Sequence, residues 1–320
     1  MNKGIIAGLD KKLISLGFKS KIKNIKSINS RRDSQVLMVK FKNGESVYLK
    51  KFSKGVIQKI DFWKRISENF ESMPKICGVV GDFVVFETIK GSRLSNILMF
   101  YSLPLHKKHF LELCSISRKI GEIIANFQIS TQENTKKFNP KNSLWDFNLR
   151  GISKIAQKVG CLLNEIDKLK QKKFLFCGLH GDFVPFNIFV NNDGIKIIDF
   201  SYKFGFDFED PITFSVALEL TQRLPWFSKK MFLELDKEFW KGYLKDNKKE
   251  WKEDEKIYKT LRYIRYYNLY QVFSNRKIKE YIFRNLSYVF PAMTDKKILL
   301  NYLNSSSLQK EENLSGSSLI

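Results

Sequence analysis

The chain has 320 residues, of which 43% are hydrophobic and 28% are charged, and its formal net charge at pH 7 is +23. These values place it among ordinary globular proteins, with room for one large domain or for two lobes that each have a core. No stretch comes near about 18 uninterrupted apolar residues, and the N-terminal residues lack the apolar core of a signal peptide. The sequence therefore gives no reason to expect a transmembrane helix.

The positive charge predicts attraction to polyanions such as nucleic acid, an anionic membrane surface or phosphorylated substrates. Lysines are spread along the chain without one dominant block, which favours a solvated lysine-rich surface. We expect no specific nucleic-acid partner, and peripheral contact with an anionic surface stays open. The cysteines (Cys77, Cys114, Cys161 and Cys177) form no Cys-x-x-Cys pair, and the histidines show no zinc-site spacing. Reduced thiols and a cytoplasmic location are therefore expected.

The first part of the chain combines a helix with strands. Residues 1–26 predict a helix and a short strand, and the polar residues 27–34 separate these from strands at 36–41 and 46–52. Asn-Gly at 43–44 is a hairpin signal between those two strands. Lys50 ends the second strand, and strand alternation directs the adjacent Lys51 to the opposite face. On these residues alone, an exposed strand lysine is the favoured interpretation of Lys50.

The middle and the end of the chain are mainly helical in pattern. Helices are predicted at 55–70, 104–127 and 149–170, and a strand runs from residue 83 towards a turn at Gly91. Apolar residues at i, i+3 and i+7 give the second of these helices one buried face. Residues 136–148 indicate a loop, and residues 212–303 are helical by composition and period. The low-complexity residues 305–320 predict a disordered tail.

A hairpin near the centre of the chain carries the polar residues of most interest. Apolar runs at 187–190 and 195–198 flank Asn-Asn-Asp-Gly at 191–194, which is a strong hairpin signal. Because a hairpin brings its outer ends together, it should gather Asp182, Asn187 and Asp199 around one small volume. Carboxylate and amide oxygens suit Mg²⁺, and phosphoryl transfer needs a base near the metal. Each short motif alone is typical of a turn, whereas their order and spacing favour a functional site.

These residues resemble a family motif. The pattern is similar to the motif of the aminoglycoside phosphotransferase and choline kinase family. It consists of His180-Gly181-Asp182, then Asn187 after four residues, and then Asp199 directly after an isoleucine. The resemblance implies an α+β, two-lobed protein-kinase-like fold with a small antiparallel-sheet N-lobe and a larger, mainly helical C-lobe. It also implies ATP and Mg²⁺ as cofactors.

The same resemblance implies roles for single residues. Asp182 would be the catalytic base, Asn187 and Asp199 would hold the metal, and His180 would fix the loop as a structural residue. Ser201 stands where protein kinases have the Gly of Asp-Phe-Gly. This difference favours the small-molecule branch.

Nucleotide-binding roles are implied further upstream. Lys50 would bind the α- and β-phosphates of ATP, with Asp61 as its acidic partner and Glu68 as the alternative. The backbone at Glu87 and Ile89 would bind adenine at the hinge between the lobes. All these roles come from the resemblance, because the residues by themselves are common on strands and helices.

Two departures from the family pattern keep other functions open. The segment 29–33, which includes Ser30 and would cover the phosphates, contains no Gly, although Gly lets a backbone approach phosphate closely. Asp61 replaces the usual Glu, so its reach towards Lys50 is shorter. A nucleotide-binding pseudokinase is therefore one alternative, and a basic polyanion-binding protein is the other.

The expected organisation is a nucleotide-binding lobe at 1–90, a catalytic and substrate lobe at 91–304, and the tail at 305–320. The expected function is an ATP-dependent phosphotransferase that moves the γ-phosphoryl group to a hydroxyl of a small molecule. The basic character of the C-terminal region favours a sugar-like, nucleoside-like or already anionic acceptor over a cationic one.

Overall fold

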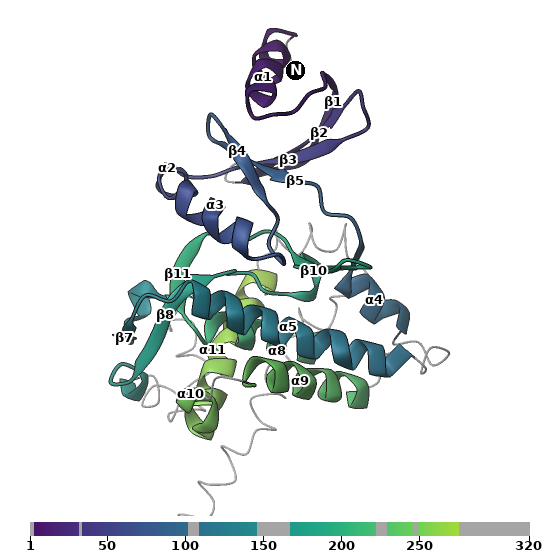
Figure 1. Cartoon of the computed structure of the whole chain (residues 1–320). Helices are drawn as coiled ribbons and strands as arrows, with labels where there is room; N and C mark the ends of the chain where they lie inside the picture. The colour runs from purple at the N-terminus through teal and green to yellow at the C-terminus, as the bar shows by residue number, and fades with distance from the viewer. Residues whose placement is uncertain are drawn as a thin grey trace, which may run out of the picture. The chain divides into compact units, whose positions relative to one another are not determined.

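A computed structural model of the chain describes residues 3–31, 34–101, 109–145, 167–221, 229–245 and 249–274. The chain divides into two compact units. Figure 1 colours the chain by residue number. The first unit comprises Met1–Ile97 and Phe186–Lys203, and the second comprises Leu98–Pro185 and Phe204–Ile320. Most of the helix expected at 149–170, and the tail at 305–320, lie outside the described residues.

The first unit is built on a five-stranded antiparallel sheet with the order β1-β2-β3-β5-β4. Its strands are β1 (Ile22–Arg31), β2 (Ser34–Phe41), β3 (Ser46–Lys51), β4 (Ile76–Val80) and β5 (Phe83–Glu87). The pairing of β1 with β2 extends to Arg31 opposite Ser34. Residues 27–31, expected to be a polar stretch between strands, are therefore strand, because β2 supplies backbone partners that no local sequence signal reports.

One face of this sheet is closed by the helix α1 (Lys3–Ser15). Leu13 of this helix is fully buried against apolar residues of four strands, including Val39, Val47 and Val85. The close fit is visible at Gly78, whose φ is +156° and where an added Cβ would lie 2.5 Å from Leu16 Cδ2. The helix expected at 55–70 is present as two helices, α2 (Lys54–Ile57) and α3 (Ile60–Asn69), interrupted at residues 58 and 59.

A second, three-stranded sheet completes the first unit. It has the order β10-β9-β6 and comprises β6 (Ser92–Arg93), β9 (Ile188–Asn191) and β10 (Gly194–Ile197). At Gly91, with φ +132°, an added Cβ would lie 2.7 Å from the carbonyl oxygen of Val190, so this approach requires glycine. The short helix α4 (Leu94–Tyr101) follows β6.

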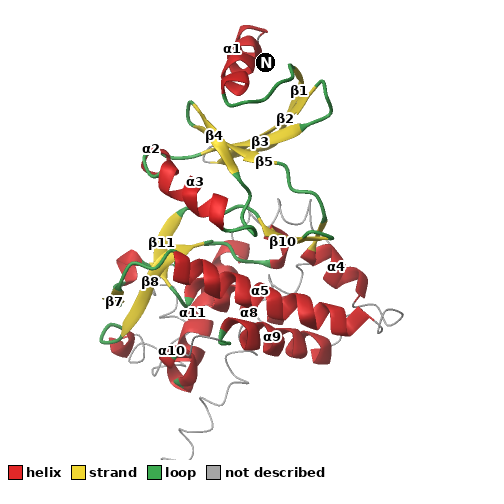
Figure 2. Cartoon of the chain, in the orientation of Figure 1, coloured by secondary structure: helices red, strands yellow, loops and turns green. Residues whose placement is uncertain are grey.

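The second unit is dominated by helices, as Figure 2 shows. Its elements are α5 (Phe110–Ser130), β7 (Thr135–Lys137), η2 (Pro140–Asn142), β8 (Lys173–Leu179), η4 (Pro185–Asn187), β11 (Lys203–Phe206), α8 (Glu209–Thr221), α9 (Lys229–Tyr243), α10 (Glu250–Glu253) and α11 (Glu255–Ser274). The strands form a sheet of order β11-β8-β7, while η4 and β11 each include residues of both units. Phenylalanines fill the core here, with Phe206, Phe208 and Phe214 buried.

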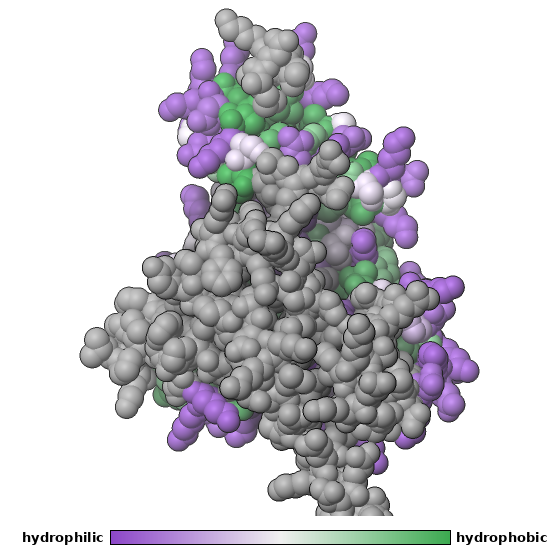
Figure 3. Space-filling view, turned by 180° about the vertical axis from the view of Figure 1, so that it is seen from behind, coloured by the Kyte–Doolittle hydropathy of each residue, from purple (hydrophilic) through white to green (hydrophobic). Residues whose placement is uncertain are grey.

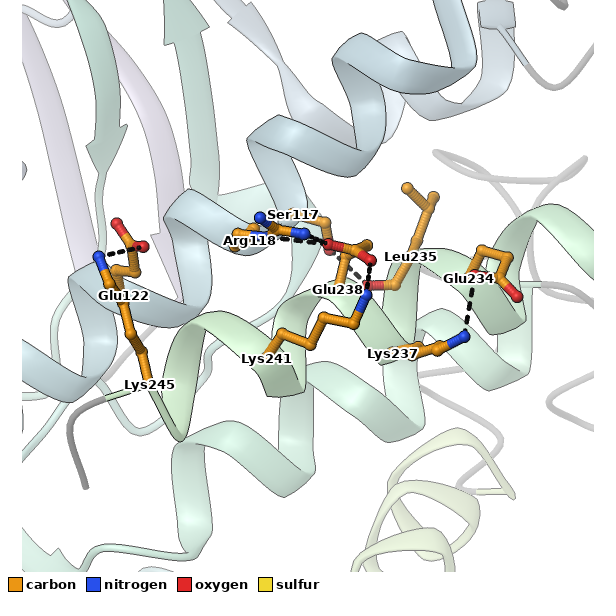
Figure 4. Close-up of polar contacts among 9 residues, drawn as sticks. All are labelled: Ser117, Arg118, Glu122, Glu234, Leu235, Lys237, Glu238, Lys241 and Lys245. Atoms are coloured by element: carbon orange, nitrogen blue, oxygen red, sulfur yellow. Dashed lines mark hydrogen bonds and ion pairs between the residues drawn. The ribbon is translucent and has the colours of Figure 1, made fainter. Parts of the chain in front are cut away.

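Helices α5 and α9 lie side by side and approach closely at two glycines. A Cβ on Gly121 would lie 2.1 Å from the carbonyl oxygen of Phe239, and one on Gly242 would lie 1.9 Å from that of Arg118. Figure 4 shows the polar contacts along this seam, where Arg118 of α5 bonds Glu238 of α9. Because backbone atoms of the partner helix limit the approach, both positions exclude a side chain.

Hydrophilic residues surround a smaller hydrophobic area in the upper part of the molecule as seen in Figure 3. The exposed large hydrophobic residues of the first unit include Ile14 and Ile28. Among the described residues, no helix is both long and apolar enough to cross a membrane.

Candidate functional site

The expected central hairpin is present as β9 and β10. Its register pairs Gly194 with Asn191 and Ile197 with Ile188. At the open end, the Ile198 N–H donates to the carbonyl oxygen of Asn187 at 2.8 Å. Asn187 and Asp199 therefore lie at the same end of the hairpin, as the turn signal predicted.

The hairpin meets the large sheet of the same unit through Lys50. Its Nζ forms an ion pair with Oδ1 of Asp199, which is 149 residues away in the sequence. Val47 and Leu49 of β3 are buried, Lys50 lies on the opposite face with 19% of its side chain exposed, and Lys51 is exposed. Strand alternation thus selects Lys50, and the structure brings it to one of the predicted metal ligands.

Asp199 has an unusual backbone conformation. Its φ is +70°, in the left-handed region that Asp tolerates better than most residues, and Tyr202 nearby has a φ of +56°. Tyr202 is buried and packs edge-on against Phe52 and Trp63, at ring distances of 5.2 and 5.5 Å. Burial raises the pKa of Tyr202 well above its ordinary value. Packing therefore holds the segment after Asp199 in a strained conformation, which is typical of a functional site.

The predicted acidic partners of Lys50 lie elsewhere. Asp61 is in the first turn of α3, where a carboxylate suits the helix dipole, and both Asp61 and Glu68 are exposed. Within the described ranges, Lys50 forms an ion pair with Asp199 and none with Asp61 or Glu68. Ser30 pairs with Gln35 in the β1–β2 ladder.

The hinge segment is tied to both sheets of the first unit. Glu87 accepts a hydrogen bond from the Lys75 N–H at 3.0 Å, and its Oε1 lies 3.8 Å from Lys196 Nζ of β10. The carbonyl oxygen of Lys90 accepts from Asn191 Nδ2 at 2.9 Å. No hydrogen bond of the Ile89 N–H is found with any part of the chain that the structure describes. Ile89 therefore presents a backbone donor beside a well-anchored strand end.

In the second unit, the loop that carries Asp182 is fixed by a buried carboxylate. Asp210 accepts hydrogen bonds from the backbone N–H groups of His180 and Gly181, at 2.7 and 2.8 Å. His180 is fully buried, and its Nδ1 accepts from the Asp182 N–H at 3.2 Å. Asp182 itself is exposed. His180 thus fixes the loop, and Asp182 is presented to solvent with its backbone held.

The contact of Asp210 with the loop was missed from the sequence. It lies in the first turn of α8, and burial raises its pKa, while the nearby His180 and the donated N–H groups lower it. The available signal was an acidic residue just before the proline that opens a helix. What the sequence did not report is that its partners lie about thirty residues upstream.

Two further acidic residues, Asp207 and Glu209, are buried in the second unit. Glu209 accepts from the N–H groups of Leu144 and Phe206 at 2.8 and 3.0 Å, and burial raises its pKa to about 8. Asp207 forms a buried ion pair with Lys249 at 2.9 Å. Both therefore hold the second unit together.

Arg265 belongs to α11. Burial lowers its pKa, whereas the carboxylates of Asp182, Glu209 and Asp210 act in the opposite direction. Its guanidinium carbon lies 5.8 Å from the ring centre of Trp145. A cationic group thus lies within electrostatic range of Asp182 in the second unit.

No protein-family model and no curated protein matches the chain. Solved structures do match. An amicoumacin kinase in complex with AMP-PNP, Ca²⁺ and Ami has a TM-score of 0.54 at 15% identity, covering 95% of this chain and all 100% of that chain. A choline kinase from Cryptosporidium parvum has a TM-score of 0.56 at 16% identity, covering 98% of this chain and 97% of that one. A thermostable mutant of an aminoglycoside phosphotransferase, in its apo form, has a TM-score of 0.55 at 12% identity, with coverages of 94% and 100%.

The chain has a protein-kinase-like fold, shared with these structures. This likeness confirms the expected fold class, with an antiparallel sheet in the N-terminal region and a helical C-terminal region. It confirms the resemblance at the level of the fold, and the residue roles stay predictions. Within that kinase fold, the first unit contains Lys50, Asp61, Glu87, Ile89, Asn187 and Asp199, and the second contains His180 and Asp182.

Proposed function

We propose that the chain is an ATP-dependent phosphotransferase that moves the γ-phosphoryl group to a hydroxyl of a small molecule. The observation that carries the proposal is the ion pair of Lys50 with Asp199, in which a strand lysine meets a carboxylate in a left-handed conformation. A lysine for phosphates and a carboxylate for a metal are the recurring parts of phosphoryl-transfer sites. The solved structures that share the fold are of kinases and phosphotransferases.

Each residue has a role in this proposal. Asp182, exposed on an anchored loop, accepts the proton of the acceptor hydroxyl. The hydroxyl oxygen of the acceptor then bonds to the γ-phosphorus while the bond from that phosphorus to the ADP oxygen breaks. Lys50 binds phosphate oxygens, and the backbone of Glu87 and Ile89 binds the base. His180 keeps the loop in position through its ring nitrogen.

The metal ligands in this proposal are Asn187 and Asp199. Amide and carboxylate oxygens suit Mg²⁺, and the side chain of Asp199 is 46% exposed, so one of its oxygens is open to a ligand while Oδ1 pairs with Lys50. The described residues contain no group of three or more His, Cys, Asp and Glu that would form a metal site on their own. A magnesium ion bound here would neutralise charge on the phosphates, as it does with few protein ligands in other kinases.

The test is transfer from ATP in the variants Asp182→Asn and Asp199→Asn, measured as ADP release with a panel of hydroxyl acceptors. Loss of the base or of a metal ligand should lower the rate by about 10²-fold or more. Asp82→Asn, at an exposed turn of the first unit, is the matched control and should keep the wild-type rate. Unchanged turnover in both site variants would refute the proposal.

A nucleotide-binding pseudokinase is the second candidate. It is favoured by the β1–β2 ladder, which extends to Arg31 opposite Ser34. The backbone that was expected to cover the phosphates is therefore already paired with β2. It is also favoured by the absence, among the described ion pairs, of one between Lys50 and Asp61. Thermal stabilisation by Mg-ATP without ADP release on any acceptor would support this candidate.

A further inference from the structure

Arg265 lies one helical turn after Arg262 on α11 and faces a different environment. Arg262 bonds Ser215 and Glu219 in the later part of α8. The carboxylates whose charge acts on Arg265 belong to the start of α8, Glu209 and Asp210, and to the loop of Asp182. The two helices therefore run antiparallel here, and Arg265 lies at the end of α8 that anchors the Asp182 loop.

The guanidinium of Arg265 has little to bind in the structure. Its Nε is buried and has no hydrogen-bond partner. Among the described residues, none forms an ion pair with Arg265. Arg262, by contrast, bonds a hydroxyl of α8, the Tyr258 hydroxyl at 2.9 Å and a carboxylate. A guanidinium whose Nε is buried loses hydration at that atom and gains no hydrogen bond there, although the Arg265 side chain as a whole is half-buried. Such a group is expected to have a ligand.

The neighbouring carboxylates do not need Arg265. Asp210 has the two N–H groups of the Asp182 loop, and Glu209 has those of Leu144 and Phe206. Arg265 lies against the ring of Trp145, the residue directly after Leu144 in the chain, and Trp145 is 5% exposed. Arg265 therefore lies against an aromatic ring near the loop of Asp182, and its Nε has no hydrogen-bond partner.

We propose that Arg265 binds an anionic group, a phosphate or a carboxylate, on the acceptor whose hydroxyl faces Asp182. The planar guanidinium offers paired donors that match both anions, and its contact with the Trp145 ring limits its movement. The anionic group takes no part in bond making and positions the hydroxyl at the base. This inference rests on the proposed function and narrows the substrate class from any small hydroxyl compound to anionic ones.

The experiment compares acceptors that differ in one charged group: glucose, glucose 6-phosphate and glucuronate, with ADP release as readout. We expect kcat/KM to be at least about tenfold higher for one of the two anions than for glucose. Arg265→Gln should remove about 10- to 100-fold of kcat/KM for that anion, the range for a hydrogen bond to a charged group, and leave glucose within about threefold. Arg265→Lys should recover part of the loss, because a point charge lacks the fork. The anion whose kcat/KM falls in Arg265→Gln shows whether the site takes a phosphate or a carboxylate.

The matched control is Lys256→Gln, which removes one positive charge from an exposed position of the same helix and should change none of these ratios. An equal loss for glucose and for both anions in Arg265→Gln would overturn the proposal in favour of a structural role. Equal use of all three acceptors by the wild-type chain would overturn it as well.

A calorimetric titration with glucose 6-phosphate and glucuronate separates this inference from the proposed function. If no acceptor yields ADP, the proposed function fails. Anion binding that is present in the wild-type chain and lost in Arg265→Gln would still support the anion site. Absence of binding of both anions would refute the site.

Discussion

The carboxylate of Asp210 tests how the fold holds the proposed base. It is 1% exposed and accepts the N–H groups of His180 and Gly181, so both donors depend on one side chain. Asp210→Asn keeps one carbonyl oxygen and turns an NH₂ group towards the second donor. Asp210→Ala removes both acceptors and leaves two N–H groups without their partner.

Hydrogen bonds to charged groups contribute about 1.5–3 kcal/mol each. Asp210→Asn should therefore lower the free energy of unfolding by about 2–3 kcal/mol, and Asp210→Ala by about 3–6 kcal/mol. Asp167→Asn is the control. The Asp167 side chain is 69% exposed, and among the described residues its ion pair is with Lys170 at the surface. That variant should stay within about 0.5 kcal/mol of the wild-type chain.

Urea unfolding followed by tryptophan fluorescence measures these differences. ADP release by the folded fraction measures the consequence for the base, because displacement of a catalytic group by about 1 Å costs about 10²-fold in rate. We expect Asp210→Asn to lower kcat by at least about tenfold while the protein is still folded. An unfolding free energy equal to that of Asp167→Asn would refute the anchoring role, whether or not the chain transfers phosphate.

Three further predictions concern other parts of the chain. Gly121→Ala should lower the free energy of unfolding in urea by about 1–3 kcal/mol or more, because the added Cβ would lie 2.1 Å from a backbone oxygen. The control is Gly55→Ala, whose added Cβ has no atom within 4 Å, so this variant should be neutral or stabilising. Burial raises the pKa of Glu209 from 4.5 to about 8, so the folded chain holds a proton that the unfolded chain releases. The free energy of unfolding should therefore fall as pH rises through that interval, and Glu209→Gln should flatten the fall; parallel curves would contradict it. Lys50→Met should weaken ATP binding by about tenfold in calorimetry, and unchanged affinity would remove Lys50 from the nucleotide site.

The parts of the site that follow local rules were predictable. Asn-Asn-Asp-Gly at 191–194 specifies a turn by its own backbone preferences, so the hairpin and the shared end of Asn187 and Asp199 could be inferred without a fold. Alternation along β3 distinguished Lys50 from Lys51 for the same reason. Such signals depend on residues that are neighbours in the chain.

The parts that depend on distant partners were not predictable. The strand character of residues 27–31 comes from pairing with β2, and the anchoring by Asp210 comes from the packing of α8 under the loop. Arg265 lies among tyrosines in a helix whose sequence pattern reports only a mixed face. Burial and partner choice at these positions are set by strand pairing and helix packing, which a single sequence does not encode locally.

The grouping of the central hairpin with the first unit has a consequence for dividing the chain. Residues 186–203 supply β9 and β10, and β9 is the partner of β6, which precedes them by almost a hundred residues. The Ile197 N–H also donates to the carbonyl oxygen of Ser72, at 2.7 Å. A fragment that stops at residue 97 would therefore lack two strands, β9 and β10, of its three-stranded sheet. The first unit is assembled from two separate stretches of sequence, so a split chain should regain it only when a peptide spanning 186–203 is added back.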